Sequence, residues 1–154
     1  MDVAKIFLTT LMSYVYFFRS ANGAFCGDPV AEYPEITPET ELITCHLSVT
    51  SLADGPFPGV DHMSVKAPVN ASVTQIMLLA EKHSGGDFWF ESDYHENFGT
   101  YVHTINGLSN DDPYYWFLYD VMDDGQTNCG TDFTRARDND HFHWLYEEYT
   151  YGYY

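Results

Sequence analysis

One segment of the chain, residues 70–83, has a helical hydrophobic period, and the segments before and after it alternate like strands. Its apolar residues recur at i, i+3, i+4 and i+7, which places them on one helix face: Val73, Ile76, Met77 and Ala80. Ser72, followed three residues later by Gln75, matches a capping box, and Gly85-Gly86 can end the helix in the left-handed conformation. We therefore predict a helix over residues 73–83.

Alternation of apolar and polar residues on both sides of this helix predicts strands. Two runs before it form a predicted hairpin: Ile43, Cys45, Leu47 and Val49, then Met63, Val65 and Ala67. After it, strands are predicted at residues 88–90, 101–105 and 114–121, and a last one through Phe142, Trp144 and Tyr146. One helix cannot cover both faces of a sheet. We predict an α+β fold of the β-grasp (ubiquitin-like) type, a mixed sheet with the helix packed across one face.

The N-terminal residues 1–24 have the pattern of a secretory signal peptide, with Lys5, an apolar run over residues 6–18 and small residues from Ser20 onward. The apolar run is shorter than the roughly 20 residues of a membrane span, although a signal anchor is the alternative. We expect a secreted, extracellular protein without a membrane span. The predicted organisation is a Pro-rich acidic arm over residues 25–42, one domain over 43–149 and a Tyr-rich tail over 150–154.

Charge and cysteine content agree with an extracellular protein. The formal net charge of −17 repels phosphate backbones, so we expect no nucleic-acid partner. Cys26, Cys45 and Cys129 are an odd set for an oxidising compartment, which implies one bridge and one further thiol, or an intermolecular link. We expect Cys129 to pair with Cys45 or Cys26; the sequence does not choose between them. Asn70-Ala71-Ser72 is a glycosylation sequon.

Candidate chemistry is sparse. His141 and His143 lie two residues apart and so face the same side of a strand, where they could bind zinc or cobalt together with His103; a solvated strand face explains them better, and we expect no metal site. The acidic pairs and runs do not have EF-hand spacing. A nucleophile elbow, a zinc-protease motif and a phosphate-binding loop are all missing from the sequence. We therefore expect no enzyme, no catalytic residues and no catalytic cofactor.

Three motifs follow one another in the second half of the chain: the run Gly99 to Gly107, then Tyr115-Trp116-Phe117-Leu118, then Asp138-Asn139-Asp140 before the last strand. In order and spacing they resemble the C-terminal domain of the cobalamin (vitamin B12) carriers transcobalamin, intrinsic factor and haptocorrin. The resemblance covers residues 44–149, and the predicted helix falls where that family has its single helix. The carriers also have a long N-terminal helical domain, for which this sequence has no counterpart. The chain thus resembles a free-standing second half of a carrier.

This resemblance implies a ligand site on two strands, made of Tyr101, Val102, Trp116 and Leu118, with Phe117 as a weaker addition. Trp116 would then lie at the sheet surface beside Tyr101, facing a corrin; alternatively, Trp116 and Leu118 are simply core residues. The implied function is a secreted, non-enzymatic small-ligand binder with cobalamin as its ligand. A lone domain supplies half a pocket, so a second subunit or a dimer would close it.

The alternative function is that of an extracellular protein-interaction or matrix protein that uses the β-grasp fold as a scaffold. Its support is the Tyr-rich tail and the aromatic content of 18%.

Overall fold

The computed structural model describes residues 25–96, 99–123, 125–127 and 129–150. The expected signal peptide and the tail beyond residue 150 lie outside these residues. The described elements follow in this order: β1 (Phe25–Cys26), β2 (Leu42–Ser51), β3 (Val60–Pro68), α2 (Val73–His83), β4 (Phe90–His95), β5 (Gly99–Ile105), β6 (Leu108–Ser109), β7 (Tyr114–Asp120), β8 (Gly125–Gln126), β9 (Thr134–Arg135) and β10 (His141–Glu148).

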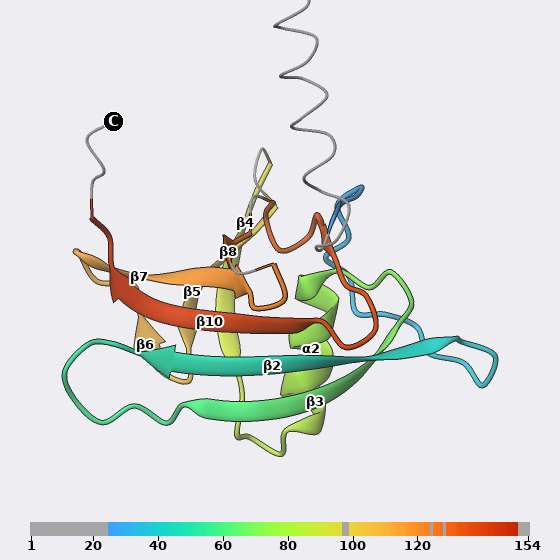
Figure 1. Ribbon diagram of the computed structural model, residues 1–154, viewed down its shortest axis with the longest axis horizontal. Helices are drawn as coiled ribbons and strands as arrows, with labels where there is room; N and C mark the ends of the chain where they lie inside the picture. Colours follow the sequence, from blue (N-terminus) through green and yellow to red (C-terminus); the bar gives the residue numbers. More distant parts are fainter. Residues whose placement is uncertain (1–24, 97–98, 124, 128, 151–154) are drawn as a thin grey trace, which may run out of the picture.

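The main sheet is mixed, as predicted, with the order β3-β2-β10-β7-β8 (Figure 1). The hairpin of β2 and β3 is confirmed, with Cys45 opposite Val65. β10 lies parallel to β2, with His141 beside His46, and antiparallel to β7. The first and last long strands are thus central neighbours, and α2 lies on one side of the sheet (Figure 1). The α+β prediction is confirmed.

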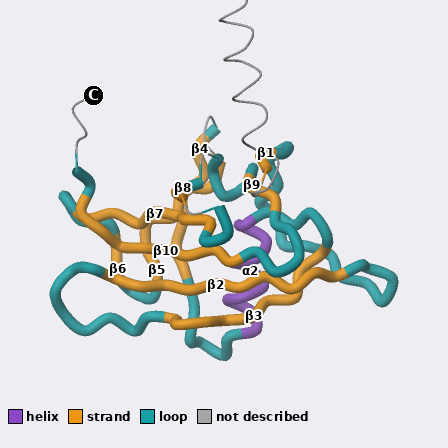
Figure 2. Tube along the Cα trace, viewed as in Figure 1, coloured by secondary structure: helices purple, strands orange, loops and turns teal. Residues whose placement is uncertain are grey.

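The strands β4, β5 and β6 form a second sheet with its own hydrogen bonds, and in Figure 2 the trace of β4 and β5 runs across the direction of the main strands. The single sheet predicted from the sequence is therefore divided, because β5 pairs with its sequence neighbours and not with the long central strands. The strand predicted at residues 88–90 was also misplaced. Phe88 is fully buried in the core, where its backbone N–H donates to Ser84 Oγ, and β4 begins only at Phe90.

The helix begins and ends as its sequence predicts. Ser72 Oγ accepts from the backbone N–H of Gln75 at 3.1 Å, and Gln75 Oε1 accepts from the N–H of Ser72 at 3.1 Å, which completes the capping box. Ser84 caps the other end by donating its N–H to Ala80 O. The predicted apolar face is buried, with Ile76 and Met77 fully inaccessible to solvent.

Alternate residues of β2, β7 and β10 form the core together with this helix face. The inward-facing residues are Ile43, Cys45, Leu47 and Val49, then Trp116 and Leu118, then Phe142, Trp144 and Tyr146. The residues between them point to the opposite side of the main sheet, which we call the open face. This face is defined by His46, Ser48, Thr50, Tyr115, Phe117, Tyr119, His141, His143 and Leu145.

The acidic arm is tied to the domain at its start. β1 pairs with β9, and Cys26 forms a disulfide with Cys129; Cys45 is a free, buried cysteine. Of the two partners considered for Cys129, the structure thus has Cys26. From Gly27 to Glu41 the arm has no helix or strand. Within the described residues, no helix has the length and apolarity that crossing a bilayer requires.

Candidate functional site

A cleft of about 440 Å³ lies beside the edge strand β3. Its walls come from the start of β3, the loop before it, the loop after α2 and the turn between β5 and β6. Both polar and apolar residues line it: Pro58, Gly59, Val60, His62, Met63, Gly86, Asp87, Trp89 and Asn106. Trp89 is the large aromatic of this set and is 38% exposed. The volume of this cleft lies within the range of small-molecule pockets, about 300–1,000 Å³.

Asn106 holds the walls of this cleft together. Its Nδ2 donates to Pro58 O at 2.8 Å and to Asp87 O at 3.0 Å, and its Oδ1 accepts from the N–H of Trp89 at 2.9 Å. Its backbone N–H donates to Trp89 O at 3.0 Å. Asn106 adopts a left-handed φ of 47°, which asparagine tolerates better than most residues. One side chain thus joins three loops that are distant in the sequence.

A smaller cleft of about 160 Å³ shares Pro58 and Asn106 with the first one. Its other lining residues are Ser51, Ala53, Asp54, Gly55, Pro56, Phe57, Gly107 and Leu108. Both clefts therefore follow the loop between β2 and β3. The Gly- and Pro-rich sequence of this loop, residues 52–59, is typical of a connection between strands and carries no signal for a site.

Three of the five residues implied by the carrier resemblance lie in the core: Val102, Trp116 and Leu118 are between 4% and 6% exposed. Trp116 does not lie at the sheet surface. Its ring packs against Phe57 and Tyr146, with centroid distances of 5.5 and 5.0 Å, and its Nε1 donates to Leu108 O at 2.8 Å. Trp116 and Leu118 are therefore core residues, which was the alternative to a ligand-facing position.

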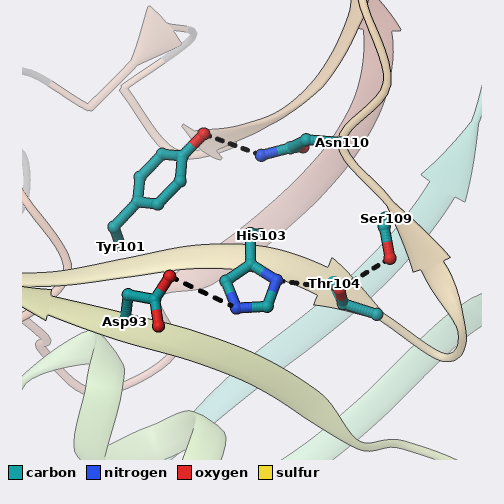
Figure 3. Close-up of polar contacts among 6 residues, drawn as sticks. All are labelled: Asp93, Tyr101, His103, Thr104, Ser109 and Asn110. Carbon is teal, nitrogen blue, oxygen red and sulfur yellow. Dashed lines mark hydrogen bonds and ion pairs between the residues drawn. The ribbon is translucent and has the colours of Figure 1, made fainter.

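Tyr101 is 50% exposed on β5, and its hydroxyl accepts from Asn110 Nδ2 at 2.8 Å (Figure 3). Asn110 also accepts the backbone N–H of Trp116 through Oδ1 at 2.8 Å. Asn110 therefore joins the surface tyrosine to β7, a role for which the sequence carried no signal. Beside them, Thr104 Oγ1 and Ser109 Oγ lie 2.8 Å apart (Figure 3).

Phe117 lies on the open face, where its ring stacks on Tyr149 with centroids 6.1 Å apart. The five implied residues thus lie in three places: the core, the outer side of β5 and the open face. None of them lines either cleft.

His103 is separate from His141 and His143. It lies on β5, where its Nε2 is 3.8 Å from Asp93 Oδ2 (Figure 3), whereas the other two lie on β10. Asn70 of the sequon is exposed, with a left-handed φ of 63°.

Comparisons with known proteins give a likeness of fold. No protein-family model matches the sequence, and no curated protein matches it either. The structure of haptocorrin in complex with Cbi superposes with a TM-score of 0.60 at 18% identity, over 75% of this chain. A protein of Ruminococcus gnavus ATCC 29149, assigned provisionally to metal binding, superposes with a TM-score of 0.50 at 16% identity, over 70% of this chain and 99% of its own.

This chain spans 27% of the length of the haptocorrin chain. At these identities the likeness shows the fold alone. The likeness of fold to haptocorrin that the sequence motifs implied is thus found at the level of structure, while no family model matches the sequence.

Proposed function

We propose that this chain is a secreted, non-enzymatic binder of a small ligand, and that the ligand occupies the 440 Å³ cleft beside β3. The cleft is the observation that carries this proposal, because its size suits a small molecule and Asn106 preorganises its walls. Trp89 supplies an exposed aromatic surface, and Asp87 and His62 supply polar groups at its rim.

The ligand we propose is cobalamin-like. This finer assignment rests on the sequence motifs and on the fold likeness to haptocorrin, whose structure contains Cbi. A corrin is larger than the cleft, so one domain would cover only part of it. Good sites bury about 70–90% of a ligand's surface, and a second subunit, either a dimer partner or another protein, would close the remainder.

One group of residues, Ser48 with His141 and His143, has the composition of a catalytic serine and its base, but its burial agrees better with a binding protein. Ser48 Oγ lies 2.8 Å from His141 Nε2 and 2.6 Å from His143 Nδ1, distances that suit a nucleophile and a base. However, Ser48 is 4% exposed in the middle of β2, where a substrate carbonyl could not approach its hydroxyl. We therefore propose no catalytic role for this group.

Secretion is proposed from the signal-peptide pattern and the Cys26–Cys129 disulfide. N-terminal sequencing of protein collected from medium should find a start between Ala21 and Cys26. A secreted chain that still begins at Met1 would contradict signal cleavage.

Ligand binding is tested by titrating purified protein with cobalamin and following absorbance and heat. Trp89→Ala should weaken binding about thirtyfold, the effect of losing about 2 kcal/mol at an aromatic anchor. Tyr94→Ala is the matched control, since Tyr94 is 68% exposed on β4 and lines neither cleft. Equal affinities of the two variants would show that the cleft is not the site. Absence of binding at about millimolar cobalamin would overturn the cobalamin assignment.

The second candidate function is a protein-interaction scaffold, and the open face favours it. Tyr115 and Phe117 both contact the half-exposed ring of Tyr149 there, and tyrosine gives large contact area at small entropic cost. A protein partner that stays bound to wild type and is lost with Phe117→Ala, while cobalamin binding is absent, would favour this function.

A further inference from the structure

Three histidines from three different strands contact one another on the main sheet. His141 on β10 lies beside His46 on the parallel strand β2, and His62 belongs to the edge strand β3. The rings of His46 and His62 are stacked, with an interplanar angle of 27° and centroids 4.6 Å apart. The ring of His141 meets both of them edge-on, with its centroid 6.2 Å from His46 and 5.7 Å from His62. We call these three residues the histidine cluster.

The histidine cluster reaches a wall of the larger cleft. His62 lines the 440 Å³ cleft, whereas His46 and His141 line neither cleft. In the described sheet β3 is an edge strand that pairs with β2 alone. The register of this pair shifts between Leu47 and Val49, opposite the start of β3. A change in the contacts of His62 therefore acts directly on one wall of the cleft.

A chain of hydrogen bonds continues from the cluster along the sheet. Ser48 Oγ lies 2.8 Å from His141 Nε2 and 2.6 Å from His143 Nδ1, and His143 Nε2 lies 2.8 Å from Thr50 Oγ1. A protonated imidazole has two donor nitrogens and no acceptor. If His141 and His143 were both protonated, the hydroxyl hydrogen of the buried Ser48 would have no acceptor in this chain. The native hydrogen bonds therefore require that at least one of the two imidazoles stays neutral.

Protonation is also opposed by repulsion within the cluster. Any two protonated rings would be like charges with centroids at most 6.2 Å apart, and like charges at this distance disfavour each other. Burial, followed by the His62, His143 and His46 imidazoles, lowers the pKa of His141. Asp120 opposes this shift, with a smaller effect than burial or the imidazoles. Burial also lowers the pKa of His143.

The other charged and titratable groups nearby keep their charge in mild acid. Tyr119 lies opposite His143 on β7, and burial, followed by its hydrogen bond to Glu147, raises its pKa to about 12. Lys66 and Asp61 add one positive and one negative side chain on β3, and carboxylates ordinarily titrate near pH 4. The imidazoles are therefore the groups around the cluster whose charge changes between pH 7.5 and 5.5.

We propose that the histidine cluster is a pH-sensitive switch of the cleft: in acid its protonated rings separate, and the start of β3, which carries His62, loosens as a wall of the cleft. The expected consequence, weaker ligand binding at low pH, rests on the proposed function of the cleft.

The direction of the effect follows from the lowered pKa values of His141 and His143 in the folded chain. The opened or unfolded chain takes up these protons first, so the stability that neutral imidazoles contribute is fully present above about pH 6.5. It is lost as the pH falls through the lower pKa values of the closed form. An imidazole with a pKa of about 6.5 in the open form that stays neutral in the closed form shifts the opening equilibrium by up to about tenfold at pH 5.5.

The test is amide hydrogen exchange of the ligand-free protein at pH 7.5 and pH 5.5, corrected for the intrinsic exchange rates. In wild type, residues 60–64 should lose up to about tenfold in protection at pH 5.5. His46→Asn and His141→Asn should each lose less than about threefold, because each variant removes one of the repelling charges. His83→Asn, which removes an exposed histidine at the end of α2, should behave like wild type. Circular dichroism at both pH values verifies that each variant is folded.

Equal protection of wild type at the two pH values, or a loss of protection that persists unchanged in both cluster variants, would overturn the switch. If one variant unfolds, the other decides the question.

Cobalamin titration at the same two pH values tests the link to the cleft. The affinity of wild type should fall by up to about tenfold at pH 5.5, and the affinity of His46→Asn should stay nearly constant. A wild-type affinity that does not change with pH would overturn the link. If wild type does not bind cobalamin at pH 7.5, the proposed ligand is wrong, and the exchange measurement still decides whether the cluster is a switch.

Discussion

Two buried tryptophans of the main sheet differ by one hydrogen bond. Trp116 Nε1 donates to Leu108 O, whereas Trp144 Nε1 has no hydrogen-bond partner among the described residues. Both rings are nearly inaccessible, with 6% and 4% of their surface exposed. An unpaired buried polar group costs about 1–3 kcal/mol. Replacing each tryptophan by phenylalanine should therefore lower the free energy of unfolding by different amounts at the two positions.

Trp116→Phe should lower the free energy of unfolding by about 1–3 kcal/mol more than Trp144→Phe, because only the first change breaks a hydrogen bond and leaves Leu108 O unpaired. Urea denaturation of both variants measures the difference. The two substitutions remove the same atoms and so control for volume. Equal losses, or a larger loss at Trp144, would contradict the assignment. Trp116→Ala, which leaves a cavity in the core where the indole ring was, should lower the free energy of unfolding by about 3–5 kcal/mol.

The thiol of Cys45 should not react with alkylating reagents in the native protein. Its side chain is fully buried, and burial, then Asp140 and Asp138, raise the pKa of its thiol to about 12. Alkylating reagents attack the thiolate, so iodoacetamide at pH 8 should label nothing until denaturant is added and should then label one cysteine per chain without reductant. Native labelling at Cys45 would show that this part of β2 is open to solvent.

At the scale of elements, helix α2 is attached at its first turn to both the arm and the loop before β9. Ser72 Oγ caps Gln75 and also donates to Val30 O at 2.5 Å. Next to it, Thr74 Oγ1 donates to Asp132 Oδ1 at 2.5 Å. The start of the helix is therefore where the arm, the helix and the loop before β9 meet.

Ser72→Ala should destabilise the protein by about 1–2 kcal/mol, because it removes the cap of the first helical turn and the bond to the arm. Chemical denaturation checks the value. Ser92→Ala, at an exposed position of β4, should change stability by less than about 0.5 kcal/mol. A Ser72→Ala variant as stable as this control would show that the capping box contributes nothing.

For the whole molecule, the Cys26–Cys129 disulfide links the start of the described chain to the loop before β9, across a sequence separation of 103 residues. A cross-link of this span removes a large part of the conformational entropy of the unfolded chain. The link also keeps β1 beside β9, where the strand pair is only two residues long.

The double variant Cys26→Ala/Cys129→Ala should lose about 2–5 kcal/mol of stability, since the unfolded chain regains that freedom. Thermal denaturation in the presence and absence of reductant tests this. Reductant should lower the melting temperature of wild type and leave the double variant unchanged. A double variant that melts like oxidised wild type would contradict a stabilising role.

Local patterns were sufficient to predict much of the fold. Helix α2, its capping box and the β2–β3 hairpin followed from periodicity and cap chemistry, which depend on residues two to four positions apart. The α+β class followed from the order of these elements. The first residue of β4 could not be predicted in this way. Phe88 is buried in the core, and its burial depends on packing against distant segments and not on residues 88–90 alone.

The site was decided by contacts between distant segments. Along β7, Trp116 alternates with Phe117, and both are aromatic, so the period reveals two faces but not which of them is buried. The parallel pairing of β2 and β10 brings His46 beside His141, and Asn106 reaches Pro58 across the cleft. Such neighbours are selected by burial of the whole sheet, whose free energy depends on all strands together, so only the folded chain could show them.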